Sequence, residues 1–287
     1  MYYGLILISV VMFGGCFALN DQYRKHRGSG LKISLQFSLS SSLAGLVVLL
    51  IVGGFRLEFT WFTLLMAVLT AINGFAFSFF GFKALGMINL SLYSLFSMLG
   101  GMMLPFLQGI LFYDEPLTVA KIVCFVFICI ALALTVEKGE KKKGTVYYIG
   151  IFVLNGMSGV LAKIFASSSL PKTSSAGFSI LSAMSSVVIA AVILLLFYRK
   201  KGDTPPATLA STVISSLSGI TNRIANFVLV IALAHVDASV QYPMVTGGVM
   251  IVSTLICFFG PNKPSKRELL SVALAFIGLL ALFLIKI

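Results

Sequence analysis

The segment ALGMINLS at residues 84–91 returns as ALAHVDAS at residues 232–239, with the Ala-Leu pair and the serine at the same spacing. A Gly-Gly pair follows each copy, at 100–101 and at 247–248. The offset between copies is 148 residues for the first feature (232 − 84) and 147 for the second (247 − 100). A strongly apolar chain with two similar halves is typical of transporters built from two structural repeats around a central site.

The composition is that of a membrane protein. Hydrophobic residues make up 59% of the 287 residues, charged residues only 10%, and the mean hydropathy is +1.04. A soluble domain carries about 25% charged residues. So few charges cannot cover a surface in water, and the long continuous apolar runs favour helices over a barrel of alternating strands.

Charged residues, proline and glycine divide the chain into ten apolar segments, most of them near the ~20 residues that cross a ~30 Å hydrocarbon core. The segments are residues 2–20, 31–53, 59–82, 87–112, 117–136, 145–166, 174–198, 207–234, 238–260 and 268–286. Five crossings in each half start the second half on the opposite side of the membrane. The predicted fold is therefore an all-α integral membrane protein of ten transmembrane helices arranged as two inverted five-helix repeats. The predicted units are residues 1–136, a basic linker at 137–144, and residues 145–287.

The net charge of +12 lies in short clusters between the apolar segments, which argues against a nucleic-acid partner and for orientation of helices in a lipid bilayer. Four basic residues fall on the side that holds the even-numbered loops and the C-terminus: Arg56, Lys121, Lys172 and Lys286. Fifteen fall in the odd-numbered loops: Arg24, Lys25, Arg27, Lys32, Lys83, Lys138, Lys141, Lys142, Lys143, Arg199, Lys200, Lys201, Lys263, Lys266 and Arg267. By the positive-inside rule we expect the odd loops in the cytoplasm and both termini outside.

Other classes of function find no support in the sequence. The run from Tyr2 to Leu19 has no positive n-region and no cleavage site, so we expect a membrane span rather than a signal peptide, in the plasma membrane of a prokaryote. The four cysteines fall inside apolar segments without metal-like spacing. No enzyme motif is present, and we expect neither a catalytic residue nor a cofactor nor a metal.

The eighth segment carries the clearest functional signal. Its polar and small residues step by three or four and form one stripe along a helix: Thr212, Ser215, Ser216, Gly219, Asn222, Arg223 and Asn226. Such a stripe must face protein or a water-filled cavity, and a cation at mid-span costs about 2.5–3.5 kcal/mol on insertion scales. We interpret Arg223 as an anion contact, with Asn222 and Asn226 as amide partners. The alternative is a structural arginine capped by carbonyls of a neighbouring helix.

Four further residues complete the predicted substrate site, each with a structural alternative. Asn73 and Gln241 could instead form hydrogen bonds between helices. Tyr242 could belong to an interfacial aromatic belt, and Lys163 could extend its stem to the membrane surface. The glycine pairs favour close approach of helices rather than binding.

The acidic residues are equally informative, because none is predicted at mid-membrane: Asp21, Glu58, Asp114, Glu115, Glu137, Glu140, Asp203, Asp237 and Glu268. A proton antiporter for lipophilic cations normally needs a buried carboxylate as proton carrier and counter-ion. The expected combination of a buried cation with no buried carboxylate favours an anionic or zwitterionic substrate.

The chain resembles the EamA-type ten-span permeases of the drug/metabolite transporter superfamily. The resemblance is carried by the segments 84–91 and 232–239 and by the turn Asp114-Glu115-Pro116-Leu117-Thr118 before the last span of the first half. It covers nearly the whole chain and implies transport of small metabolites through a cavity lined by both halves. The chain departs from the family in three ways. Asn262 stands where the second turn glutamate would fall, the glycine pairs stand where many relatives have proline, and relatives are usually drawn with cytoplasmic termini.

The sequence thus predicts a secondary transporter, monomeric or homodimeric, of a small anionic or zwitterionic metabolite such as an amino acid or organic acid. A multidrug or cationic-metabolite exporter is the first alternative. A membrane scaffold that transports nothing is the second, although it leaves the duplication and the polar stripe without a purpose.

Overall fold

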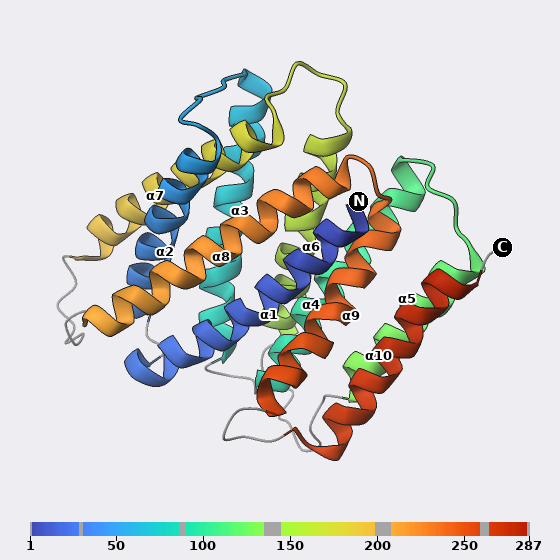
Figure 1. Ribbon diagram of the computed structural model, residues 1–287. Helices are drawn as coiled ribbons and strands as arrows, with labels where there is room; N and C mark the ends of the chain where they lie inside the picture. The colour runs from blue at the N-terminus through green and yellow to red at the C-terminus, as the bar shows by residue number, and fades with distance from the viewer. Residues whose placement is uncertain are drawn as a thin grey trace.

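The computed structural model describes residues 2–28, 31–85, 90–134, 145–198, 208–258 and 264–285. Within these ranges the chain forms helices joined by turns and contains no strand (Figure 1). The helices are α1 (Tyr2–Arg27), α2 (Leu31–Val52), α3 (Trp61–Leu85), α4 (Leu90–Phe112), α5 (Val119–Leu134), α6 (Thr145–Ser167), α7 (Ser175–Tyr198), α8 (Leu209–Leu233), α9 (Ala238–Phe258) and α10 (Lys266–Leu284). The predicted linker at 137–144 and Asn262 lie outside the described residues.

Each predicted apolar segment coincides with one helix, and local breakers set several of the ends. Helix α1 continues beyond the expected residue 20 and ends at Arg27. The first residue after position 20 that ends the helix is Gly28, whose φ is +85°. Helix α2 ends before Gly54, at φ +62°, and the turn after α4 holds Asp114 at φ +51°. Glycine adopts this left-handed backbone freely, and aspartate tolerates it better than most residues.

Among the described residues, six helices are long and apolar enough to cross a membrane: those at Tyr2–Asn20, Lys32–Val52, Ile149–Ser167, Ser175–Leu196, Leu209–Leu233 and Ala238–Ile256. Shorter apolar stretches lie in α3, α4, α5 and α10. Large apolar side chains cover much of the outer surface, and Val11, Val47 and Val188 are each more than half exposed. An outer surface of this kind fits lipid rather than water.

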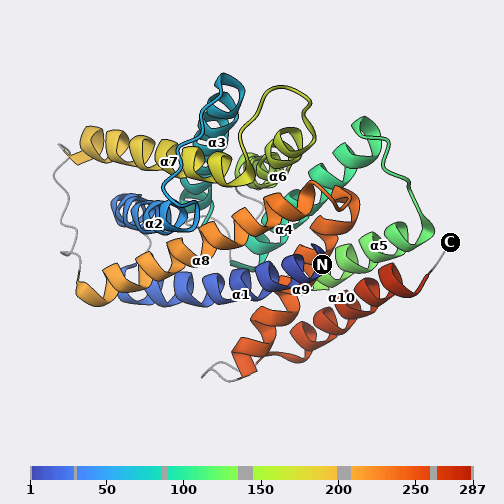
Figure 2. The ribbon, with the colours of Figure 1, turned by 45° about the horizontal axis from the view of Figure 1, so that its top comes forward.

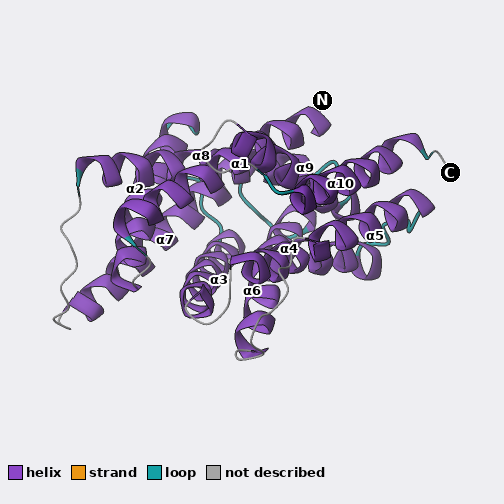
Figure 3. Cartoon of the chain, turned by 90° about the horizontal axis from the view of Figure 1, so that it is seen from below, coloured by secondary structure: helices purple, strands orange, loops and turns teal. Residues whose placement is uncertain are grey.

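Each helix of the first half corresponds to the helix five places later, so that α1 corresponds to α6 and α5 to α10. Corresponding helices make corresponding packing contacts. Helix α1 packs on α8 and α9, as α6 packs on α3 and α4, and α2 packs on α8 as α7 packs on α3. The pairs α2–α7, α4–α9 and α5–α10 map onto themselves. Figures 2 and 3 show α2 and α7 at one edge of the bundle and α5 and α10 at the opposite edge.

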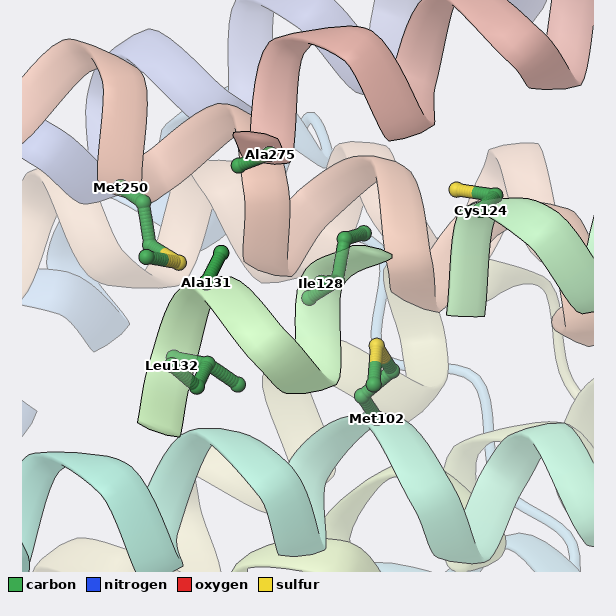
Figure 4. Packing of buried hydrophobic residues seen from close by; sticks show 7 residues of the cluster. All are labelled: Met102, Cys124, Ile128, Ala131, Leu132, Met250 and Ala275. Atoms are coloured by element: carbon green, nitrogen blue, oxygen red, sulfur yellow. The ribbon is translucent and has the colours of Figure 1, made fainter. Parts of the chain in front are cut away.

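Helices α5 and α10 are held to the bundle by a buried apolar cluster (Figure 4). Its members come from α4, α5, α9 and α10: Met102, Cys124, Ile128, Ala131, Leu132, Met250 and Ala275. A buried hydrogen bond accompanies the apolar contacts, from Ser271 Oγ to the Ala131 carbonyl at 2.6 Å. The edge pair therefore depends mainly on side-chain packing.

Helices α4 and α9 meet in the middle of the bundle, and each contains a buried proline. Pro105 lies inside α4 and Pro243 inside α9. Pro105 lies four residues after Gly101, and Pro243 lies four residues before Gly247.

The glycine pair of α4 permits a close crossing with α6, as the structural interpretation of these glycines predicted. A Cβ atom on Gly100 would overlap the backbone of Phe152, and one on Gly101 would approach the Asn155 amide. Since backbone atoms cannot move aside as a flexible side chain can, Gly100 is required for this crossing.

Gly100→Ala should therefore destabilise the protein by about 1–3 kcal/mol, the usual range for overpacking. Gly15→Ala in α1 is the matched control, because nothing lies within 4 Å of the position its Cβ would take. Thermal melting of the purified protein in detergent should show a lower melting temperature for Gly100→Ala and an unchanged or slightly higher one for Gly15→Ala. Equal melting temperatures for the two variants would refute the close crossing.

Candidate functional site

Helix α8 carries the predicted polar stripe and begins with a capping box between Thr208 and Ser211. Arg223 lies near the middle of this helix, where it crosses α2 at very short range. A Cβ on Gly45 would lie 2.5 Å from Arg223 Cγ, and one on Gly219 would overlap the backbone of Ser41. Two glycines thus bring α2 and α8 together, and the Arg223 stem lies across that crossing.

The stripe divides into two functional parts. Ser215 and Gly219 are buried against α2, and Ser215 Oγ lies 2.7 Å from Ser40 Oγ. These two positions face protein, which is one of the two environments predicted for the stripe, and they hold α8 to α2. Thr212 is exposed and bonds the Thr208 carbonyl at 3.1 Å.

Arg223 has no hydrogen bond or ion pair to any group within the described ranges, and its side chain is only partly buried. Two buried lysines of the described helices do have acidic partners. Lys163 Nζ lies 2.7 Å from Glu115 Oε1, and Lys121 Nζ lies 2.8 Å from Asp237 Oδ2. A capped structural arginine would bond to carbonyls of a neighbouring helix, so this alternative does not describe Arg223. The guanidinium is available to a ligand, and its five N–H donors match a carboxylate or phosphate.

Asn222 and Asn226 are exposed on the face of α8 that otherwise contacts protein. The same face is buried before them, at Ser215 and Ser218, and again after them, at Leu229. When a helix face is buried at both ends and exposed only in its middle, the exposed residues typically border an internal hollow. Asn226 Nδ2 donates to the carbonyl of Asn222 at 2.8 Å and to its Oδ1 at 3.1 Å. The Asn222 Nδ2 group keeps its donors for another partner.

The corresponding position in the first half is Gly74 of α3, which the repeat offset aligns with Asn222 (222 − 148). Met66 and Ala67 on the same face of α3 are buried, whereas Gly74 is exposed and a Cβ built on it would meet nothing within 4 Å. The otherwise buried faces of α3 and α8 therefore each have an exposed residue at aligned positions, Gly74 and Asn222.

Asn73 and Gln241 join helices. Asn73 Nδ2 donates to the Leu154 carbonyl and to Ser158 Oγ, each at 2.9 Å, and ties α3 to α6. Gln241 is 1% exposed, and its Nε2 donates to the Leu229 carbonyl of α8 at 3.2 Å. The structure does not bring either side chain to Arg223.

Lys163 and Tyr242 belong to a different place, around a carboxylate that the sequence did not identify. Glu115, in the turn between α4 and α5, is only 6% exposed. The expectation that the chain holds no buried carboxylate is therefore wrong, and so is the alternative of a lysine that extends to the surface, since Lys163 is 7% exposed and paired. Tyr242 Oη donates to the Gly159 carbonyl of α6 at 2.9 Å.

The Glu115 carboxylate is fully engaged. Besides Lys163 it accepts hydrogen bonds from the backbone N–H groups of Ala238 and Ser239, both at 2.8 Å, and from Ser239 Oγ at 2.6 Å. These groups form the start of α9, where unpaired N–H groups favour an anion. Gly109 leaves the room, because a Cβ there would overlap the carboxylate. A buried lysine without another partner was the sequence signal that could have revealed this site.

Burial by itself raises the pKa of Glu115, but the hydrogen bonds from Lys163, Ser239 and Ala238 lower it, and the pKa lies below the usual 4.5. A carboxylate with a lowered pKa stabilises the fold above its unfolded pKa and loses that effect as the pH falls through its folded pKa.

Glu115→Gln should therefore lower the melting temperature at neutral pH, and the difference from the parent should shrink below about pH 4.5 because the parent then loses the same charge. Melting curves recorded from pH 7 down to pH 3 check this. A difference that stays constant over this range would show that the charge of Glu115 contributes nothing.

Comparison with known proteins identifies the fold alone. No family model matches the chain, and no curated protein matches it. Solved structures do match, and one of them is a crystal structure described only as that of a protein. It has a TM-score of 0.75 and 18% sequence identity and covers 96% of this chain and 94% of its own. The helical architecture of this chain therefore occurs, over nearly its full length, in an experimental structure.

Proposed function

We propose that this protein is a secondary transporter of a small anionic or zwitterionic metabolite, similar to the EamA-type permeases of the drug/metabolite transporter superfamily. The observation that carries the proposal is the partly buried guanidinium of Arg223, which has no partner within the described chain. A cation at this depth in an apolar bundle is costly and typically marks a substrate or ion pathway.

The recognition step follows from the groups left available on α8. Arg223 binds the carboxylate or other acidic group of the substrate, and Asn222 Nδ2 adds a neutral donor beside it. Asn226 orients Asn222 through its two hydrogen bonds. Gly74, exposed on α3, leaves space on the side of the first half, so that the substrate lies between the halves.

In this proposal the chain crosses the membrane ten times, as two inverted repeats of five helices, and this architecture provides the two conformations of the transport cycle. The exchange pattern of helix packing supports it, since inverted repeats make equivalent contacts from opposite sides. The positive-inside rule then puts both termini outside, in a plasma membrane. The two conformations of alternating access arise when the halves exchange their packing.

A cationic substrate is less favourable even though a buried carboxylate exists. Glu115 is neutralised by Lys163 and bonded to three donors of α9, so it has no free charge to offer. On α8 the partly buried charge without a partner in the described chain is the cation Arg223.

The test is ligand stabilisation of purified protein by a panel of amino acids, organic acids and lipophilic cations. We expect an acid to raise the melting temperature, because binding to the native state at 100 times Kd stabilises it by about 2.7 kcal/mol. Arg223→Ala should abolish this shift and the uptake of the same acid into proteoliposomes, while Arg223→Lys retains part of both.

Arg56→Ala is the matched control, since it removes an arginine from the exposed segment between α2 and α3. Its ligand-induced shift and uptake should equal those of the parent. Stabilisation by a cation alone, or an unchanged response of Arg223→Ala to the acid, would refute the proposed role of Arg223.

A further inference from the structure

We infer that Glu115, Lys163, Ala238 and Ser239 form a latch that closes one end of the bundle, and that its release opens this end during transport. The inference rests on the proposed function, because a gate has a purpose only in a protein that moves a solute. It adds a device that the binding site itself does not provide.

The latch joins the two halves of the chain. Glu115 belongs to the turn between α4 and α5 of the first half, whereas Lys163 lies near the end of α6 and Ser239 at the start of α9. Four hydrogen bonds of 2.6 to 2.8 Å converge on the one carboxylate. Charge-assisted bonds of this kind are roughly twice as strong as neutral ones.

Other contacts between the halves lie at the same end of the bundle (Figure 1). The Tyr2 ring stacks on His235 with centroids 4.0 Å apart. Glu58 accepts from the Ser174 backbone N–H at 2.6 Å, and Lys121 pairs with Asp237. The structure therefore represents the conformation in which this end is closed, with Glu115 as its most buried acidic member.

Two orphaned acceptors beside the latch oppose the closed state. The Oε1 atoms of Gln108 and Gln241 are buried and have no hydrogen-bond partner among the described residues. Gln108 precedes Gly109, where an added Cβ would overlap the Glu115 carboxylate, and Gln241 lies two residues after Ser239. A buried acceptor without a partner destabilises the closed conformation. When this end opens, water can donate a hydrogen bond to the acceptor and remove that cost. The closed end thus combines strong bonds with a local penalty, which keeps two conformations close in free energy.

The chemistry of the latch also suits reversible opening. A carboxylate and an ammonium that separate into water regain hydration, so the open state leaves neither charge buried. An apolar seal in the same place would expose its side chains to water each time it opened.

Spin labels on Leu117→Cys and Leu170→Cys measure the opening directly. Both positions are exposed, one in the turn that carries Glu115 and the other in the segment after α6. The native cysteines are replaced by alanine, and pulsed EPR records the distance distribution of the full chain in liposomes. Glu115→Gln should raise the ratio of long to short distances about ten-fold, which corresponds to about 1.4 kcal/mol. Ser239→Ala, which removes one bond, should raise it less.

Asp114→Asn is the matched control, because it removes one negative charge from the same turn at an exposed residue whose φ of +51° asparagine also tolerates. Its distances should equal those of the parent. Unchanged distances in Glu115→Gln and Ser239→Ala, with only a lower melting temperature, would overturn the latch and leave Glu115 as a rigid structural contact. The EPR readout needs no substrate, so a chain that opens in this way but moves no solute would retain the latch and refute the proposed transport.

Discussion

A charge enclosed by apolar helices needs a partner, and this constraint organises the polar residues of the whole protein. Lys163 forms an ion pair with Glu115, and Lys121 forms one with Asp237. The neutral amides follow the same rule with backbone carbonyls, as Asn73 does with Leu154. Against this background the free guanidinium of Arg223 is informative, because its partner must come from outside the described chain.

The helices could be predicted from the sequence because each end depends on a local signal. Glycine, proline and charge clusters separate the apolar segments, and those signals act over a few residues. The extension of α1 to Arg27 departs from the prediction for the same reason, since polar residues without a breaker can continue a helix. A polar extension of this kind reaches beyond the apolar part that ends at Asn20.

The candidate site was predictable only in part. The spacing of Asn222, Arg223 and Asn226 identified one face of a helix, and periodicity is a local property. Periodicity could not tell that Ser215 and Gly219 on the same stripe pack on α2, because that depends on where another helix crosses. The burial of Glu115 depends likewise on a turn that folds back onto a helix of the other half, 48 residues away in sequence at Lys163.

The two central helices, α4 and α9, each contain a buried proline that removes one backbone hydrogen bond from the helix. A proline has no N–H to offer the carbonyl four residues before it, so the carbonyls of Gly101 and Ser239 are each left without their helical amide. Each helix therefore lacks one backbone hydrogen bond at this turn and bends there more easily than an uninterrupted helix. Ser239 is both a donor to Glu115 and the residue whose carbonyl Pro243 leaves without its helical amide, so the weakened turn of α9 starts at the contact that holds the halves together.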